Sequence, residues 1–249
     1  MLKRSTKCLL ILLAVLLGKT SSWSQSTVDS SYQINPVYAN IVSDFYKKVG
    51  SESRLYNGIQ YDFYDPSILG NAYFNDVNIW TKGSLIYDGY IYNNVSLLYD
   101  LYTDRLVMLF YNNFLKITLT TERIQSFQLL DHNFIYFKND PSNPTSLSTG
   151  FYALLYDGKT KVFGRYSKSI QHASNISGTI ISTFTPSTDY YTFKDGKYYK
   201  TNGQGSFLDV LKNHKKEIKQ YLKDNQITFK VSPEQSMATI AAYYDSLPN

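Results

Sequence analysis

Alternating apolar and polar positions predict a series of short antiparallel β-strands between about residues 55 and 137. Residues 95–101, 106–110 and 115–119 each place apolar side chains at every second position, so each run has one apolar face. Consecutive strands joined by short turns pair in an antiparallel sense, which predicts a meander with one buried and one wetter face. The turn-forming pairs that separate these runs are Asp88-Gly89, Asn93-Asn94, Thr103-Asp104 and Asn112-Asn113.

A spacing of three and four residues predicts helices near both ends of the chain. Asn35 is a suitable N-cap, Pro36 occupies the preferred first helical position, and apolar residues follow at every fourth position through residue 49. Near the other end, the apolar residues of 206–222 fall on one helical face. The run Ser232-Pro233-Glu234-Gln235 is a capping box that predicts the start of a last helix.

Together these patterns predict a mainly β (α+β) protein. We expect the antiparallel meander to form an open barrel or a curved sheet, with an N-terminal helix and a two-helix C-terminal appendage. The N-terminal helix and the antiparallel β domain would together occupy residues 25–189. A β-hairpin and the helical appendage would occupy residues 190–249. Residues 138–150 and the Ser/Thr-rich residues 167–189 are predicted to be surface loops, although the second stretch could also be a weakly ordered strand.

The first 24 residues have the composition of a secretory signal peptide. Three basic residues precede an apolar run from residue 8 to 17, and a small-x-small site, Ser22-Trp23-Ser24, follows. The run has about half of the ~20 residues needed to span a bilayer, so no transmembrane segment is expected after signal removal. The lone Cys8 would leave with the signal. We therefore expect an exported protein without disulfides that is periplasmic, outer-membrane-associated or extracellular.

The charge of the chain is concentrated in one region. The complete sequence carries +5, from 25 basic and 20 acidic residues, and residues 1–24 hold four of the basic ones and no acidic residue. A nearly neutral mature chain argues against nucleic acid as a partner. Residues 194–230 nevertheless hold nine lysines and four acidic residues. The lysines of the predicted helix are either a contact for an anionic surface or an ordinary solvated face: Lys212, Lys215, Lys216, Lys219 and Lys223.

Residue patterns typical of catalysis are missing from the sequence. It contains no G-x-S-x-G motif, and its three histidines, His132, His172 and His214, have no neighbouring nucleophile pattern. No histidines or cysteines have the short spacing of a zinc site, and no glycine-rich loop opens a helix to hold phosphate. We therefore expect no metal and no cofactor.

The acidic residues at the turns are the remaining candidates for catalysis. Asp88 with Asp100 or Asp104 could form the carboxylate pair of a glycan hydrolase, and some of the 24 tyrosines could stack on sugar rings. However, Asp88 and Asp104 lie in predicted turns, where aspartate is favoured. The turns therefore explain these two residues without a catalytic role. We therefore expect no enzymatic activity, and glycan hydrolysis is the least favoured of the functions considered.

Several segments resemble a family of exported proteins from Gram-negative bacteria. They are SRLYNGIQYDFYDP (53–66), GSLIYDGYIYNNVSLLYDLYTD (83–104), DGKYYK (195–200) and AAYYDSL (241–247). The resemblance extends over most of the mature chain and implies a location in the cell envelope. It implies no catalytic or binding residue, because that family has no assigned activity.

The leading hypothesis is a non-catalytic exported envelope protein that binds a partner protein or a surface glycan. The alternative is a periplasmic carrier of a lipid or another apolar ligand held in an open β-barrel. Burial distinguishes the two hypotheses. A carrier needs an empty apolar cavity, whereas a binding protein should have a filled core and an exposed aromatic or basic patch.

Overall fold

The computed structural model describes part of the chain, and residues 35–249 form one compact unit. The predicted signal peptide and the helix predicted at 35–49 lie outside the described residues, apart from helical positions at 40, 41 and 44. The predicted turn at Asn112-Asn113 also lies outside them. The described residues are 40–41, 44, 54–110, 114–143, 147–174 and 176–248.

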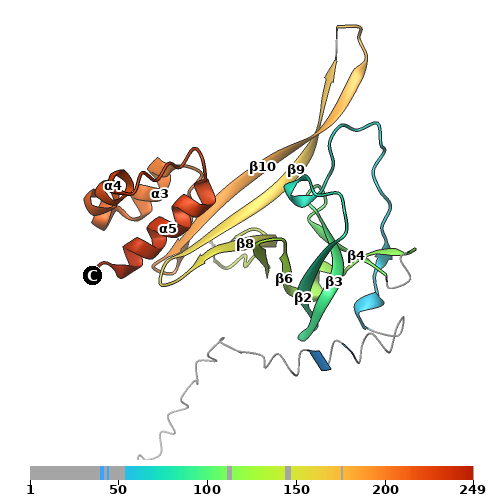
Figure 1. Ribbon diagram of the computed structural model, residues 1–249, viewed down its shortest axis with the longest axis horizontal. Coiled ribbons are helices and arrows are strands. Elements are labelled where there is room, and N and C mark those ends of the chain that lie inside the picture. Colours follow the sequence, from blue (N-terminus) through green and yellow to red (C-terminus); the bar gives the residue numbers. More distant parts are fainter. Residues whose placement is uncertain are drawn as a thin grey trace, which may run out of the picture. The chain divides into compact units, whose positions relative to one another are not determined.

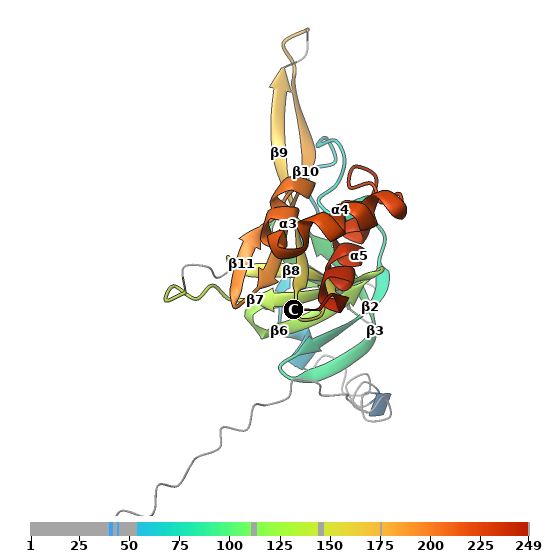
Figure 2. The same ribbon diagram turned by 90° about the vertical axis from the view of Figure 1, so that its left-hand side faces the viewer.

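An antiparallel sheet of 11 strands is the centre of the fold (Figures 1 and 2). Its order is β1-β5-β4-β3-β2-β6-β7-β8-β9-β10-β11, which begins and ends on different strands, so the sheet is open. The predicted meander is therefore confirmed. The strands are β1 (Ile59–Gln60), β2 (Thr81–Tyr87), β3 (Tyr90–Asp100), β4 (Arg105–Leu109), β5 (Lys116–Thr118), β6 (Ile124–Leu129), β7 (His132–Phe137), β8 (Gly150–Asp157), β9 (Lys161–Ser174), β10 (Ile180–Lys194) and β11 (Lys197–Lys200).

Turn chemistry explains why β2 and β3 form a hairpin. Asp88 and Gly89 both have positive φ, 51° and 79°, as a two-residue type I′ turn requires. The prediction of a second turn at Asn93-Asn94 is wrong, because both residues lie inside β3. They face the single residue Ser84 of β2, and Asn94 has a φ of 59°. The pair is therefore a β-bulge, which bends the strand without ending it.

Of the two structures considered for residues 167–189, the loop is wrong and the strand is confirmed. β9 and β10 pair continuously from Lys161 with Phe193 to Ser174 with Ile180. Threonine and isoleucine favour extended backbone, and the one proline of the stretch, Pro186, is compatible with an unpaired edge of a strand. Figure 1 shows this hairpin extending beyond the other strands of the sheet.

Aromatic rings fill the concave side of the sheet. Phe127 of β6 stacks on Phe134 of β7 at 4.7 Å between ring centroids, and Tyr99 of β3 lies 5.0 Å from Phe134. Tyr99 also contacts Phe151 of β8 at 5.8 Å, although three strands separate β3 from β8 in the sheet. The sheet is therefore strongly curved. The chain has one cysteine and no disulfide, so the fold depends on this packing, at about 1.5–3 kcal/mol for each large side chain buried.

Polar contacts hold the two approaching parts of the curved sheet together. Lys168 N of β9 donates to Leu101 O, just after β3, at 3.1 Å. Asp104, in the turn between β3 and β4, accepts hydrogen bonds from Tyr99 Oη at 2.6 Å and from Arg165 Nη2 at 3.1 Å. Burial raises the pKa of Asp104, and the bonds from Tyr99 and Arg165 act in the opposite direction.

Three α-helices follow the sheet, where two were predicted. They are α3 (Gln204–Val210), α4 (Lys215–Asp224) and α5 (Pro233–Ser246). The single helix predicted over 206–222 is interrupted at Leu211, whose ψ is 27°, and the chain makes one 3₁₀ turn before α4. The remaining 3₁₀ turns lie before β1, before β2 and before β6. The four are η2 (Arg54–Tyr56), η3 (Phe74–Asp76), η4 (Thr121–Arg123) and η5 (Lys212–His214).

The apolar stripes of the helices dock on the sheet. Phe207 of α3, Ile218 of α4 and Ile240 of α5 are buried together with Val162 of β9 and Tyr190 of β10. Helices as short as α3 and α4 are marginal in water, so this burial stabilises them. None of the helices in the described part of the chain is long and apolar enough to cross a membrane.

We expect Gly150→Ala to destabilise the protein by more than about 2 kcal/mol. Gly150 has a φ of 143°, and an added Cβ would overlap Arg165 Nη1 and Asp104 Oδ2. Arg165 cannot move away without losing its bond to Asp104. Chemical denaturation measures the effect.

Gly205→Ala in α3 is the matched control. An added Cβ there meets no atom within 4 Å, and the change should stabilise the helix by about 0.5–1 kcal/mol. Equal effects of the two substitutions would contradict the close packing assigned to Gly150.

Candidate functional site

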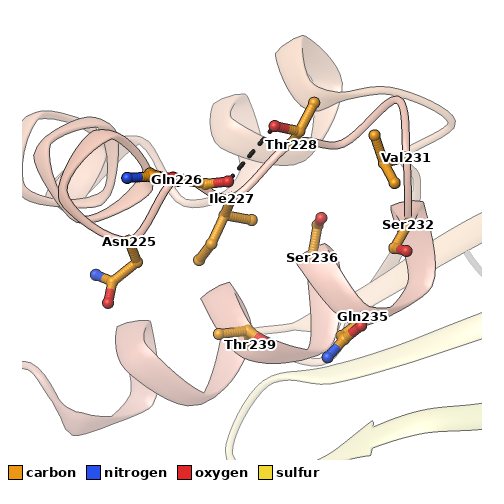
Figure 3. Close-up of a pocket in the computed structure, with 9 residues that line it drawn as sticks. All are labelled: Asn225, Gln226, Ile227, Thr228, Val231, Ser232, Gln235, Ser236 and Thr239. Atoms are coloured by element: carbon orange, nitrogen blue, oxygen red, sulfur yellow. Dashed lines mark hydrogen bonds between the residues drawn. The ribbon is translucent and has the colours of Figure 1, made fainter.

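The segment that joins α4 to α5 leaves a cleft against the first turns of α5. Its volume is about 350 Å³ (Figure 3). Pro233 occupies the first turn of α5, where its missing amide hydrogen costs no helical hydrogen bond. In Figure 3, Ser236 and Thr239 of α5 lie across the cleft from the connecting segment. The lining residues are Asn225, Gln226, Ile227, Thr228, Val231, Ser232, Gln235, Ser236 and Thr239.

The residues that line the cleft are uncharged and mostly polar by type, although apolar atoms contribute more of the lining surface than polar atoms do. Seven of its nine side chains carry an amide or a hydroxyl group, and only Ile227 and Val231 are apolar. Amides and hydroxyls both donate and accept hydrogen bonds. Ser236 is buried in the first turn of α5 with 4% of its surface exposed, so this polar residue lies away from bulk water. Such a lining fits a neutral ligand surface rich in hydroxyl groups.

A stacked pair of tyrosines lies on the same two helices as the cleft. The rings of Tyr221 in α4 and Tyr243 in α5 are 3.9 Å apart and almost parallel. Tyr221 is one helical turn before Asn225, and Tyr243 is one turn after Thr239. The two helices are therefore held together next to the cleft.

The lysines predicted to contact an anionic surface lie on η5 and α4, whose buried residues are Ile218 and Leu222. All are exposed except Lys215, which is half-buried and donates to Asp209 Oδ1 at 2.6 Å. Lys223 precedes Asn225 by two residues, so the lysine face and the cleft are formed by neighbouring segments of the chain. We call this surface the lysine face: Lys212, Lys215, Lys216, Lys219 and Lys223.

A charged cluster of Asp131, His132 and Glu234, which we call the anchor, attaches the start of α5 to the sheet. His132 at the start of β7 has Nδ1 2.7 Å from Asp131 Oδ1 and Nε2 3.1 Å from Glu234 Oε2. Glu234 Oε1 accepts hydrogen bonds from Tyr166 Oη at 2.7 Å and from Tyr190 Oη at 3.3 Å. Because both ring nitrogens of His132 face carboxylates, the doubly protonated ring satisfies both contacts.

The hydrogen bond that His132 donates to Glu234 raises the pKa of His132, against the opposing effect of burial. Burial acts to raise the pKa of Glu234, but the hydrogen bonds from His132 and Tyr166 outweigh it and lower that pKa. Each group therefore stabilises the charged form of the other.

The acidic residues considered for hydrolysis are not arranged as a catalytic pair. Asp88 is at one end of β3 and Asp100 at the other, and an 11-residue strand spans roughly 35 Å. The two carboxyl groups of a glycosidase are at most about 9.5 Å apart. Asp88 instead forms an ion pair with Arg123, and Asp104 bonds with Tyr99 and Arg165.

Asp100 is fully buried and serves as a structural acceptor. Its side chain accepts hydrogen bonds from the hydroxyls of Tyr61 at 3.0 Å and Tyr64 at 2.6 Å. It also accepts from the backbone amides of Tyr102 at 2.9 Å and Thr103 at 3.1 Å. A carboxylate with these four donors and 0% exposure cannot contact a polysaccharide.

The two histidines outside the anchor have local partners. His172 Nδ1 lies 2.9 Å from Ser182 Oγ on the neighbouring strand, and His214 contacts the ring of Tyr244. No group of three or more histidine, cysteine or acidic side chains that could hold a metal ion occurs among the described residues.

Sequence reasoning found the lysine face but missed the cleft and the anchor. Ser232, Gln235, Ser236 and Thr239 recur at helical spacing beside the apolar stripe of α5, and this polar stripe was the available signal. The contact between His132 and Glu234 joins residues 102 positions apart, so no local sequence pattern predicts it.

Comparisons with protein-family models, with curated proteins and with solved structures find no match for this chain. The function is therefore argued from the geometry of the molecule.

We expect the anchor to contribute most to stability between about pH 4.5 and 6.5, the ordinary pKa values of glutamate and histidine. The raised pKa of His132 gives stability that is complete below 6.5 and is lost as the pH rises through the raised value. The lowered pKa of Glu234 gives stability that is present above 4.5 and is lost as the pH falls through the lowered value. Glu234→Gln should therefore cost about 1–3 kcal/mol near pH 5.5 and less near pH 8.5.

Glu217→Gln is the control for this measurement by denaturant unfolding. Glu217 faces His214 at 3.8 Å on the exposed side of α4, and such a pair contributes less than about 1 kcal/mol. A Glu234→Gln effect of the same size at both pH values would contradict the anchor's role.

Proposed function

We propose that the protein is a non-catalytic exported protein of the bacterial envelope that binds an anionic surface glycan through its C-terminal helices. The observation that carries this proposal is the presence of both the lysine face and the uncharged cleft among the C-terminal helices, on neighbouring segments of the chain. Export and the envelope location are inferred from the N-terminal sequence pattern.

The cleft accounts for recognition of the sugar rings. A sugar ring displays hydroxyls that donate and accept, and the amides and hydroxyls around the cleft offer both functions in return. Ile227, at the centre of the view in Figure 3, adds an apolar surface for the C–H face of a ring. The absence of charge among the nine lining residues makes the cleft suitable for the neutral part of the polymer.

The lysine face accounts for attraction to the anionic groups of the same polymer. Exposed ammonium groups keep their water and act through long-range attraction, with a reach of about 8 Å at physiological salt. Carboxylates or phosphates spaced along a glycan can meet several lysines at once, while the neutral rings occupy the cleft. The proposed site therefore combines weak charge attraction with directional hydrogen bonds.

The packing of the sheet favours this function over a carrier of apolar ligands. A carrier would need an empty apolar cavity inside the curved sheet. The described interior is instead occupied by rings in mutual contact, with Phe134 touching Phe74, Tyr99 and Phe127. The filled interior leaves the outer surface for binding.

We expect a quadruple change of Lys212, Lys215, Lys216 and Lys219 to glutamine to abolish retention on immobilised lipopolysaccharide. Wild-type retention should fall steeply as salt rises above ~0.15 M, because exposed charges are screened. The free energy of unfolding should change by about 1 kcal/mol or less, since three of the four lysines are exposed and the ion pair of Lys215 with Asp209 lies at the surface.

The matched control removes four exposed lysines from other elements and so changes the net charge equally. Its substitutions to glutamine are at Lys82, Lys138, Lys159 and Lys197. The control protein should bind like wild type. Equal binding by all three proteins, or no binding by wild type at low salt, would refute the proposed function.

A second variant tests the cleft separately. Gln235→Ala with Thr239→Val removes two polar groups from the lining while preserving helix α5. We expect affinity for the soluble polysaccharide part of lipopolysaccharide to fall about 5-fold for each lost hydrogen bond, with the salt dependence unchanged. Unaltered affinity would show that the lysine face binds without the cleft.

A further inference from the structure

The outer edge of β9 is unpaired beyond Lys168. In an antiparallel ladder, alternate residues direct their backbone groups toward opposite neighbours. Lys168 N bonds to Leu101 O on the side away from β10, so the next residues facing that side are Ile170, His172 and Ser174. Within the described part of the chain, no backbone group bonds to the amides or carbonyls of these three residues on that side.

The corresponding edge of β10 is protected. Leu69 donates to Ser182 O at 2.9 Å and accepts from Phe184 N at 3.0 Å, on the side of β10 away from β9. The next residue that faces this side is Pro186, opposite Lys168 in the ladder, and proline has no amide hydrogen to offer. The edge of β10 is thus protected from Ser182 to Pro186, whereas no such protection is described for β9 over residues 170–174.

The open edge also lacks the charges that usually prevent strands from pairing. Residues 169–188 contain no aspartate, glutamate, lysine or arginine. Soluble proteins commonly place charged side chains, above all lysine, on exposed edge strands to prevent association. An isolated two-stranded hairpin is also only marginally stable in water, so an added strand would stabilise this one.

We propose that the edge of β9 pairs with the same edge of a second copy of this chain to form a symmetric dimer. The three outward-facing residues define a self-complementary antiparallel register, in which His172 lies opposite His172 and Ile170 lies opposite Ser174 of the other copy. Three such pairs form about six backbone hydrogen bonds. The two-fold axis passes between the two His172 residues, as a closed dimer requires.

Three features favour a second copy as the occupant of this edge. The register matches the strand to itself, and the absence of formal charge removes repulsion between identical edges. The protected edge of β10 stops the assembly at two copies instead of a fibre. The interface is small, so the dimer is expected to form only at high protein concentration.

Sedimentation of the purified full chain over a range of concentrations tests this proposal. Wild type should shift from monomer to dimer as concentration rises, and hydrogen exchange of residues 170–174 should slow in parallel. His172→Pro removes an outward amide and should abolish the dimer, in the way that Pro186 protects β10. His172→Lys places two like charges in opposite positions and should abolish it as well.

Thr185→Lys is the matched control, because it adds a charge to the same hairpin on the strand away from the open edge. It should dimerise like wild type, and thermal unfolding of all variants should show that the fold is retained. A wild type that stays monomeric at every concentration would overturn the proposal. So would equal dimerisation of the His172→Lys and Thr185→Lys proteins, or assembly beyond the dimer.

Discussion

The structure depends on one constraint. A single sheet must bury its apolar face without a second sheet to cover it. The rings of β3, β6, β7 and β8 can leave water only if the sheet bends until its own strands face one another. The 5.8 Å contact between Tyr99 and Phe151 marks the point where this occurs. The bulge at Asn93-Asn94 supplies part of the curvature, and the bonds of Asp104 and Lys168 hold the two parts of the sheet together.

Because aromatic rings fill the described interior of the sheet, both proposed binding surfaces lie on the outside of the molecule. The helices cover β9 and β10 with apolar side chains, and the anchor of Glu234 on His132 fixes the start of α5. The proposed glycan cleft lies on this fixed helix, whereas the open edge of β9 lies on the part of the hairpin that the sheet does not support. The two proposed surfaces thus differ in rigidity, which suits a positioned ligand site and a weak contact between copies, respectively.

Much of the secondary structure could be predicted from local pattern. The alternation in residues 95–119 predicted the meander, Asp88-Gly89 predicted its hairpin, and helical spacing predicted α5 together with the exposed lysines of α4. Periodicity and turn chemistry are properties of neighbouring residues, so a single sequence carries them. For residues 167–189 the sequence left a loop and a strand as alternatives, because a Ser/Thr-rich composition suits both. Only pairing along the whole length of β9 distinguishes the two.

Of the candidate site, only the charged lysine face could be predicted from the sequence. The helical pattern identified the lysines, but the cleft exists because the segment after α4 folds back against α5. The anchor exists because curvature of the sheet and docking of the helices bring Glu234 to His132, Tyr166 and Tyr190. The catalytic pairing of Asp88 with Asp100 fails because β3 keeps them at opposite ends. Sequence pattern decided the elements and their faces, whereas contacts between residues distant in the chain depend on how the sheet bends, which only the tertiary structure decides.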